Sequence, residues 1–124
     1  MPDKNNYEKG GENMELLTVE LKEKLPALYA QEKERDPLVY IKFFDPTGSW
    51  TWYATEGEEA DDDFLFFGYV VGHDSELGYF TLSQLRSAKK GVSGILSLPI
   101  ERDLYFKPCR LSEVKGLNQS MCKF

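Results

Sequence analysis

The sequence predicts one α+β domain, built on a mainly antiparallel sheet of four or five strands with two short helices packed on one face. Aromatic and β-branched residues gather in short runs separated by turn residues, which is typical of strands joined by hairpins. Two other segments combine a helix-capping residue with apolar residues at helical spacing. The chain has 124 residues, of which 41% are hydrophobic and 14% aromatic, so it can bury one sizeable core.

The domain is expected to span residues 14–114, between two polar segments. Residues 1–13 show no periodic apolar pattern, which indicates a disordered leader, and residues 115–124 are expected to form a loose tail. No apolar run approaches the roughly 20 residues that cross a bilayer, and none near the N-terminus resembles a signal peptide. We therefore expect a cytoplasmic protein without a membrane partner.

The first helix is expected near residues 19–24. Thr18 suits the N-cap position because its hydroxyl can accept a hydrogen bond from a backbone amide of the first turn, and Glu20 complements the helix dipole. Pro26 interrupts the apolar spacing, since a proline removes a backbone donor and disfavours a helical residue before it. We therefore expect the helix to end there and a separate turn to follow over residues 26–31.

The first two strands are expected to form a hairpin. Residues 38–45 alternate between two faces, with Ile41 and Phe43 on the same one. The segment Asp45 to Gly48 has the composition of a tight turn, and the second strand follows from Trp50.

Trp50 and Trp52 lie two residues apart in this second strand and therefore share a face, whereas Tyr53 points to the other. Two interpretations of the tryptophans remain open. They form either an aromatic platform that stacks on a base, a sugar or a proline-rich peptide, or a part of the core that packs under a helix.

A block of six acidic residues follows and is expected to form a charged loop between two strands, because neighbouring like charges repel each other and need water. The block consists of Glu56, Glu58, Glu59, Asp61, Asp62 and Asp63. The formal net charge of the chain is −6, so these side chains account for all of it. The next strand, residues 64–71, is apolar on both faces and is expected to be central, with Gly68 marking a bulge or the close approach of another backbone.

The second half of the domain is expected to contain a strand, a helix and an edge strand. The strand covers residues 76–80. Thr81 and Gln84 fit a capping box, which predicts a helix over residues 82–89. The edge strand is predicted over residues 104–107.

The acidic block disfavours direct binding to nucleic acid, which depends on Lys and Arg at phosphates, and is compatible with docking on a basic surface of another protein. We weigh three interpretations of the block: a solvated hairpin loop, a divalent-cation site, and a mimic of nucleic-acid phosphates that occupies a basic groove. The block lacks the alternating spacing and the glycine of a calcium loop. We expect no metal site and no cofactor.

The histidine and cysteine content limits nucleophilic and metal chemistry. His73 is the only histidine in the sequence, so one chain cannot supply a site with several histidines, and its neighbours suggest a turn. Cys109 and Cys122 lie in no recognisable motif, and whether they pair is left open.

A second candidate site contains Arg102, which lies between two acids. The guanidinium could pair with a carboxylate in a bidentate manner or form a structural salt bridge to Glu56 or Glu76. With the aromatic residues, this arrangement predicts an alternative function, that of a small enzyme or a small-ligand-binding domain. The cleft would use Trp50, Trp52, Tyr53, Glu56, Glu76, Arg102 and Asp103, and its glutamates and aspartate would be candidates for acid and base chemistry.

Several segments in combination resemble one protein family. These segments are residues 17–18, 24–29, 50–56, 65–68, 76–80 and 98–106. They resemble the DUF2958 family, small proteins of unknown function encoded on bacterial plasmids, phages and conjugative elements. The resemblance covers about residues 14–114 and implies an accessory protein of a mobile element, without assigning an activity or a catalytic residue. The longer acidic tip, through Asp63, falls outside the pattern of the family.

The leading hypothesis from these observations is a non-enzymatic interaction protein of a mobile genetic element. Its acidic block would dock on a basic surface of a partner protein, and an anti-defence role against a host nuclease would use such a surface.

Overall fold

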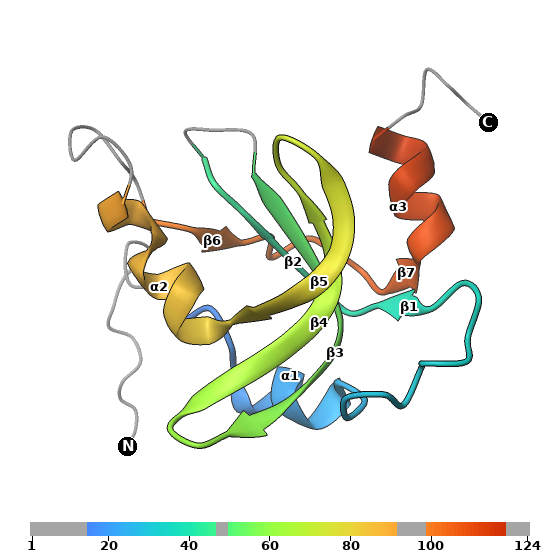
Figure 1. The fold of residues 1–124 in the computed structure, drawn as a ribbon, viewed down its shortest axis with the longest axis horizontal. Coiled ribbons are helices and arrows are strands. Elements are labelled where there is room, and N and C mark those ends of the chain that lie inside the picture. Colours follow the sequence, from blue (N-terminus) through green and yellow to red (C-terminus); the bar gives the residue numbers. More distant parts are fainter. Residues whose placement is uncertain (1–14, 47–49, 92–98, 119–124) are drawn as a thin grey trace.

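Five antiparallel strands form the central sheet, in the order β5-β4-β3-β2-β6 (Figure 1). The computed structural model describes residues 15–46, 50–91 and 99–118. The strands of the sheet are β2 (Ile41–Phe44), β3 (Thr51–Ala60), β4 (Asp63–Val71), β5 (Ser75–Thr81) and β6 (Glu101–Arg102). A separate pair is formed by β1 (Leu38–Val39) and β7 (Cys109–Arg110). The α+β class and the mainly antiparallel sheet are therefore confirmed.

Three helices surround the sheet: α1 (Val19–Lys24), α2 (Leu82–Gly91) and α3 (Leu111–Asn118). Thr18 caps α1 as predicted, because its Oγ1 accepts a hydrogen bond from the amide of Leu21 at 3.2 Å. The capping box of α2 is also present: the amide of Gln84 donates to Thr81 Oγ1 at 3.1 Å and the amide of Thr81 donates to Gln84 Oε1 at 2.8 Å. The third helix was not predicted, and it occupies part of the segment that was expected to be a loose tail.

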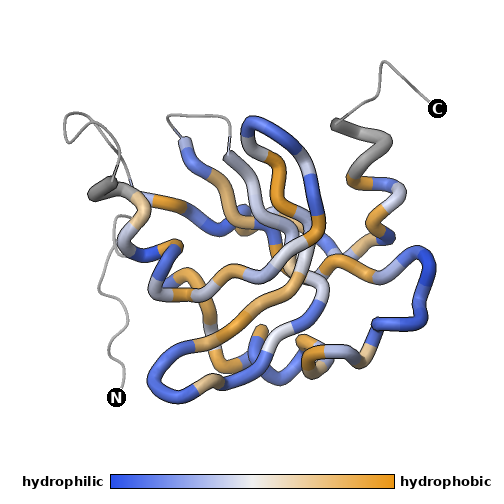
Figure 2. The backbone as a smooth tube through the Cα atoms, in the orientation of Figure 1, coloured by the Kyte–Doolittle hydropathy of each residue, from blue (hydrophilic) through white to orange (hydrophobic). Residues whose placement is uncertain are grey.

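Each face of the sheet carries its own apolar cluster. The first face buries the larger one, to which α2 contributes Leu82 and Leu85 and against which Leu21 of α1 packs. The second face buries a smaller cluster, which α3 closes with Leu111 and Val114. Hydrophobic segments accordingly follow the strands, whereas hydrophilic residues gather at the β3–β4 turn and in the loop before β1 (Figure 2).

The β3–β4 hairpin corrects the predicted acidic loop. Strand β3 continues to Ala60 and β4 begins at Asp63, so the turn consists of Asp61 and Asp62 alone, with Asp61 at a φ of 57°. Glu58 and Glu59 belong to the strand. Their side chains alternate between the two faces and do not lie next to each other, which lets consecutive acids remain in a regular ladder.

A bulge in β3 lies against Gly68 of β4, which confirms the predicted close approach. The register shifts between Ala54 and Glu56, and a Cβ at position 68 would lie 1.8 Å from the carbonyl oxygen of Tyr53. Only glycine fits there. Because the bulge adds one residue to β3, the side-chain alternation shifts and Glu56 lies opposite Phe67 on the second face.

The predicted edge strand over residues 104–107 is wrong. The side chain of Asp103 accepts a hydrogen bond from the amide of Tyr105 at 2.9 Å, and the carbonyl of Asp103 accepts one from Phe106 at 3.3 Å. This turn captures the backbone groups that a strand ladder would need. Pairing is instead limited to the two residues of β6 and the two of β7.

Some predictions concern residues outside the described ranges. They are the leader over residues 1–13, Thr47 and Gly48 of the first turn, the tail beyond Asn118, and the pairing of Cys122. In the described ranges, no helix has the length and apolar character needed to cross a membrane.

Candidate functional site

Part of the second face lies open beside its buried cluster. Tyr69 of β4 belongs to that cluster and is 6% exposed, whereas Tyr79 of β5 is 51% exposed. Tyr79 lies on the neighbouring strand, two residue positions closer to the β3–β4 turn. Tyr79 pairs across the strands with Phe67, and the two rings meet edge to face at 4.9 Å. Leu77, the next residue of β5 on this face, is 53% exposed. We call this surface, formed by Tyr29, Leu65, Phe67, Leu77 and Tyr79, the open face.

Tyr29 reaches the open face from the loop after α1. Its hydroxyl lies 3.3 Å from the hydroxyl of Tyr79, and its ring is 63% exposed. Its backbone has a φ of 73°, a left-handed conformation that costs a residue with a side chain about 1–2 kcal/mol. Surrounding contacts must therefore hold this loop in place.

Glu56 provides the contacts that hold the loop. This carboxylate is 5% exposed, and it accepts the amide of Tyr29 at 2.8 Å and the amide of Gln31 at 2.7 Å. The Gln31 side chain then donates to the carbonyls of Leu38 and Thr55 and accepts the amide of Leu38. Hydrogen bonds to a charged acceptor are stronger than neutral ones, so this network offsets the strain at Tyr29.

Acidic groups border the open face. The pKa of the Tyr79 hydroxyl is raised, first by its hydrogen bond with Tyr29, then by desolvation, and also by the charges of Glu56 and Glu32. Glu58 projects from β3 on the same side and accepts the amide of Leu28 at 3.3 Å. The exposed aromatic residues thus lie in a negative environment.

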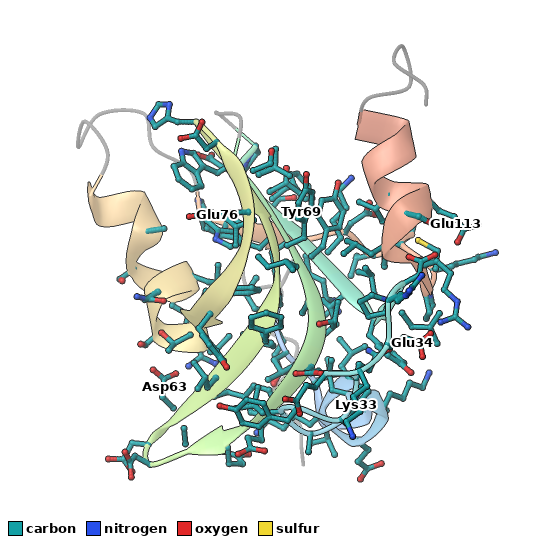
Figure 3. The ribbon with its side chains drawn as sticks, turned by 45° about the vertical axis from the view of Figure 1, so that its right-hand side comes forward. Lys33, Glu34, Asp63, Tyr69, Glu76 and Glu113 are labelled. Atoms are coloured by element: carbon teal, nitrogen blue, oxygen red, sulfur yellow. The ribbon has the colours of Figure 1, made fainter. Side chains whose placement is uncertain are left out.

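The structure separates the six acids of the predicted block by role. Glu56 is buried in the loop network, and Glu59 forms an ion pair with Lys22 at 3.0 Å. Asp63 accepts the amide of Ser83 at 3.1 Å and its hydroxyl at 2.6 Å, which ties the hairpin to the start of α2 (Figure 3). These hydrogen bonds, with that of the Ser83 hydroxyl first, lower the pKa of Asp63.

Glu58, Asp61 and Asp62 are the remaining members of the block, and all three are exposed. The two aspartates form the turn at the end of the hairpin. This hairpin end, defined by Glu58, Asp61 and Asp62, is the part of the acidic block that faces solvent next to the open face.

The tryptophans divide between core and surface. Their rings stack at a centroid distance of 6.1 Å on the first face. Trp52 is partly buried against the larger cluster, whereas Trp50 is 38% exposed and meets the ring of His73 edge to face at 5.8 Å. Gly72 lies under Trp50, where a Cβ would come within 2.4 Å of the indole.

The residues of the predicted cleft are divided between the two faces of the sheet. Arg102, Trp52 and Glu76 share one row of the first face, but Phe43 lies between the first two and Val70 between the last two. Tyr53 lies in the buried cluster of the second face.

Arg102 and Asp103 line two small hollows beside β6, of about 200 and 280 Å³. Burial lowers the pKa of the Arg102 guanidinium, although Glu15 raises it, and this guanidinium donates to the carbonyl of Glu15. Asp103 pairs with Lys42 at 3.6 Å. Ligand pockets usually enclose about 300–1,000 Å³, so both hollows are small for that purpose.

The sequence interpretation did not include Tyr29, Leu77 or Tyr79 as functional residues. The alternation of Leu77 and Tyr79 in a short strand was a usable signal, because it places two large side chains on one face. No signal indicated Tyr29, because the contacts that hold its loop on this face, those with Glu56 among them, join residues far apart in the sequence. Among the described residues, no group of three or more His, Cys, Asp or Glu side chains could hold a metal ion.

Comparison with known proteins identifies the family. A family model described as "Protein of unknown function (DUF2958)" matches residues 16–117. No curated protein and no solved structure matches the chain. The match covers most of the sequence, including the hairpin, the open face and all but the last residue of α3, and the chain therefore belongs to the DUF2958 family.

Proposed function

We propose that this chain is a non-enzymatic interaction protein of a mobile genetic element, which docks through the open face and the hairpin end on a basic surface of another protein. The observation that carries this proposal is the exposed tyrosine pair, Tyr29 and Tyr79, held on a rigid base and surrounded by acids. The nucleic-acid-binding surface of a host defence nuclease is the partner class that we propose.

The aromatic part suits a protein interface. Tyrosine is enriched in interfaces because it offers a large contact area with few rotatable bonds. Tyr79 belongs to a strand, and Tyr29 is held by the carboxylate of Glu56. Binding would therefore immobilise little that is not already ordered, which lowers its entropic cost.

The acidic part selects the charge of the partner. Glu32, Glu58, Asp61 and Asp62 are all exposed on or beside this surface. Complementary charge speeds association and disfavours partners of the same sign. Surfaces that bind nucleic acid gather Lys and Arg, so a nuclease offers the basic surface that these acids require. Membership of the DUF2958 family supports the link to mobile elements through the resemblance described above.

The test first captures a partner protein and then removes the negative charge of the hairpin end from this chain. The tagged chain is used to capture host proteins, each captured protein is identified by mass spectrometry, and its Kd is measured after purification. A variant with Asp61→Asn and Asp62→Lys is expected to bind at least about tenfold more weakly at low salt, and a DNA duplex should compete with the wild-type chain. Asparagine is chosen at position 61 because it tolerates the positive φ found there.

The matched control changes the same amount of charge elsewhere. Glu20→Gln with Glu23→Lys alters two exposed acids of α1, outside the open face and the hairpin end, and should leave the Kd unchanged. Equal affinity of the wild type and the hairpin-end variant would overturn the docking proposal, and so would a partner that nucleic acid does not displace.

A further inference from the structure

The outer edge of the sheet at β5 is free to accept another strand. Strand β5 spans seven residues, Ser75–Thr81, and is the last in the order of the sheet. In the described part of the chain, no strand pairs with its outer side. Natural proteins usually protect such an edge with lysine, proline, a bulge or a covering element. The sequence of β5 contains neither lysine nor proline, and its register with β4 is uninterrupted.

The register shows which main-chain groups face outward. A two-residue turn makes Ala60 and Asp63 the closing hydrogen-bonded pair of the β3–β4 hairpin. Alternation along β4 then directs the main-chain groups of Gly68 toward β5, where Gly78 is its partner. The N–H and C=O groups of Leu77, which is adjacent to Gly78, therefore point away from the sheet.

The same alternation applies along the rest of β5. The groups of Tyr79 also point outward, as do those of Thr81. The amide of Thr81 indeed donates to Gln84 Oε1, at the start of α2. The edge thus presents the main-chain groups of Leu77 and Tyr79, and both of these residues carry their side chains on the open face.

The two sides of the edge favour different side chains in an added strand. On the open face, Leu77 and Tyr79 are each more than half exposed and offer apolar contact. On the first face, a Cβ at Gly78 would meet no atom within 4 Å, which leaves room for a long side chain, and the exposed carboxylate of Glu76 lies next to it. The stem of an arginine or lysine fits this space while its charge reaches the glutamate.

We propose that the partner contributes an extended segment of alternating apolar and basic residues, which adds a strand to the sheet along β5. Main-chain hydrogen bonds supply affinity in this mode of recognition, and the alternating side chains supply specificity. This inference rests on the proposed docking function and specifies how the partner binds. A second copy of this chain is a poorer occupant, because the chain carries a net charge of −6 and acids border both sides of the edge.

The probe is a fluorescein-labelled peptide of about eight residues that alternates valine and arginine, a length typical of strands. Two further peptides carry N-methyl groups, one on the valine amides and the other on the arginine amides. All three have the same charge and side chains, but only one set of amides faces β5. In an antiparallel addition these are the valine amides. The valines then lie directly opposite Leu77 and Tyr79, with their side chains on the open face, and such opposite residues exchange main-chain hydrogen bonds.

The expected result is saturable binding of the parent peptide, a loss of at least about tenfold for one methylated peptide, and a change of less than about twofold for the other. Equal behaviour of the two methylated peptides would overturn strand addition, as would the absence of binding by the parent. On the protein side, Leu77→Pro removes an outward amide at a position where edge strands tolerate proline, and it should weaken binding more than Leu77→Ala does. Thermal unfolding of both variants verifies that they are folded.

The outcomes separate this inference from the function on which it rests. If charge alone drives docking, both methylated peptides bind equally and the Asp61→Asn, Asp62→Lys variant weakens both. If the proposed function is wrong, the Asp61→Asn, Asp62→Lys variant binds the captured partner with the same Kd as the wild type. This result does not depend on which of the two methylated peptides binds. Analytical ultracentrifugation tests for a dimer of the chain. A dimer that Leu77→Pro abolishes would assign the edge to a second copy of the chain and would overturn the proposal of a basic partner segment.

Discussion

The two halves of the second sheet face are built from the same strands but differ in what covers them. In one half, Tyr53 and Tyr69 are buried under α3 and the β1–β7 pair. In the other half, Phe67 is half-buried and Tyr79 is more than half exposed. Strand β4 contributes an aromatic residue to each half, so residue type does not decide burial on this face. The presence or absence of a covering element decides it.

The open half is nevertheless ordered by contacts of its own. The covered half packs the ring of Tyr53 against Tyr69 and Phe106. The open half packs Phe67 against Tyr79 and adds Tyr29, whose loop is fixed by a buried carboxylate. An exposed apolar surface that is held rigid is typical of a binding site.

The covered half should be the more sensitive to truncation. Leu111 of α3 is 7% exposed, and Leu111→Ala should lower the free energy of unfolding by about 2–4 kcal/mol, because it removes buried methyl groups and leaves a cavity. Urea denaturation measures this loss. The control is Leu77→Ala in the open half, which should cost less than about 0.5 kcal/mol. Similar losses for the two variants would mean that the open half is covered in solution.

Removing the carboxylate of Glu56 should disorganise the open half. Glu56→Gln replaces one acceptor oxygen by a donor opposite a backbone amide, and leaving such an amide unsatisfied costs about 1–3 kcal/mol. Thermal unfolding measures the change. Glu58→Gln is the matched control, since Glu58 is exposed and accepts only a long hydrogen bond from Leu28. An unchanged midpoint for Glu56→Gln would show that the loop around Tyr29 does not depend on this carboxylate.

A smaller effect is expected at Asp63, which ties the hairpin to α2 on the first face. Its pKa is lowered below 3.8, so the contact stabilises the fold above that pH and is lost as the pH falls through the lowered pKa. Asp63→Asn should therefore unfold at a lower temperature than the wild type at neutral pH, and the difference should shrink below pH 3.8. Melting curves over a pH series test this, and a difference that persists in acid would exclude the ionised carboxylate as its cause.

The smallest expected effect concerns the tyrosine pair. The hydrogen bond with Tyr29 is the first cause of the raised pKa of Tyr79, so Tyr29→Phe should bring that pKa back toward 10.0 without unfolding the protein. Tyrosine ring signals in an NMR titration follow the change. If the pKa of Tyr79 does not move, the two hydroxyls are not in contact in solution, and the open face is less ordered than the contacts described above.

The helices show why some elements could be predicted and others could not. The cap of α2 is local, because Thr81 and Gln84 lie three residues apart. α3 has only half of such a local cap, because Glu113 accepts the amide of Arg110 at 2.7 Å while Arg110 offers no hydroxyl in return. The other cap is distant: Asp36 accepts both the amide and the hydroxyl of Ser112, across 76 positions in the sequence. A pattern along the chain contains the complete capping box of α2 but only half of one for α3, so α2 was predicted and α3 was not.

The acidic block shows the same limit for the candidate site. Its composition correctly indicated a hairpin with charged residues near its turn. The buried role of Glu56, however, depends on amides of Tyr29 and Gln31, which lie 27 and 25 positions earlier. The charge of a residue is visible in the sequence, but the donor that will meet it is not. The two-residue strands β6 and β7 were missed for a related reason, since they are too short to form a periodic pattern.

The distant cap of α3 also bears on the order in which the molecule assembles. The hairpins from β2 to β5 pair neighbouring segments, whereas α3 needs Asp36, Val39 and Tyr53, so its docking requires a loop that spans most of the domain. We therefore expect α3 to dock late. Before Val114 has been synthesised, Tyr53 and Tyr69 would be exposed and would extend the open face into one continuous apolar surface. The growing chain would be most prone to aggregation in that interval.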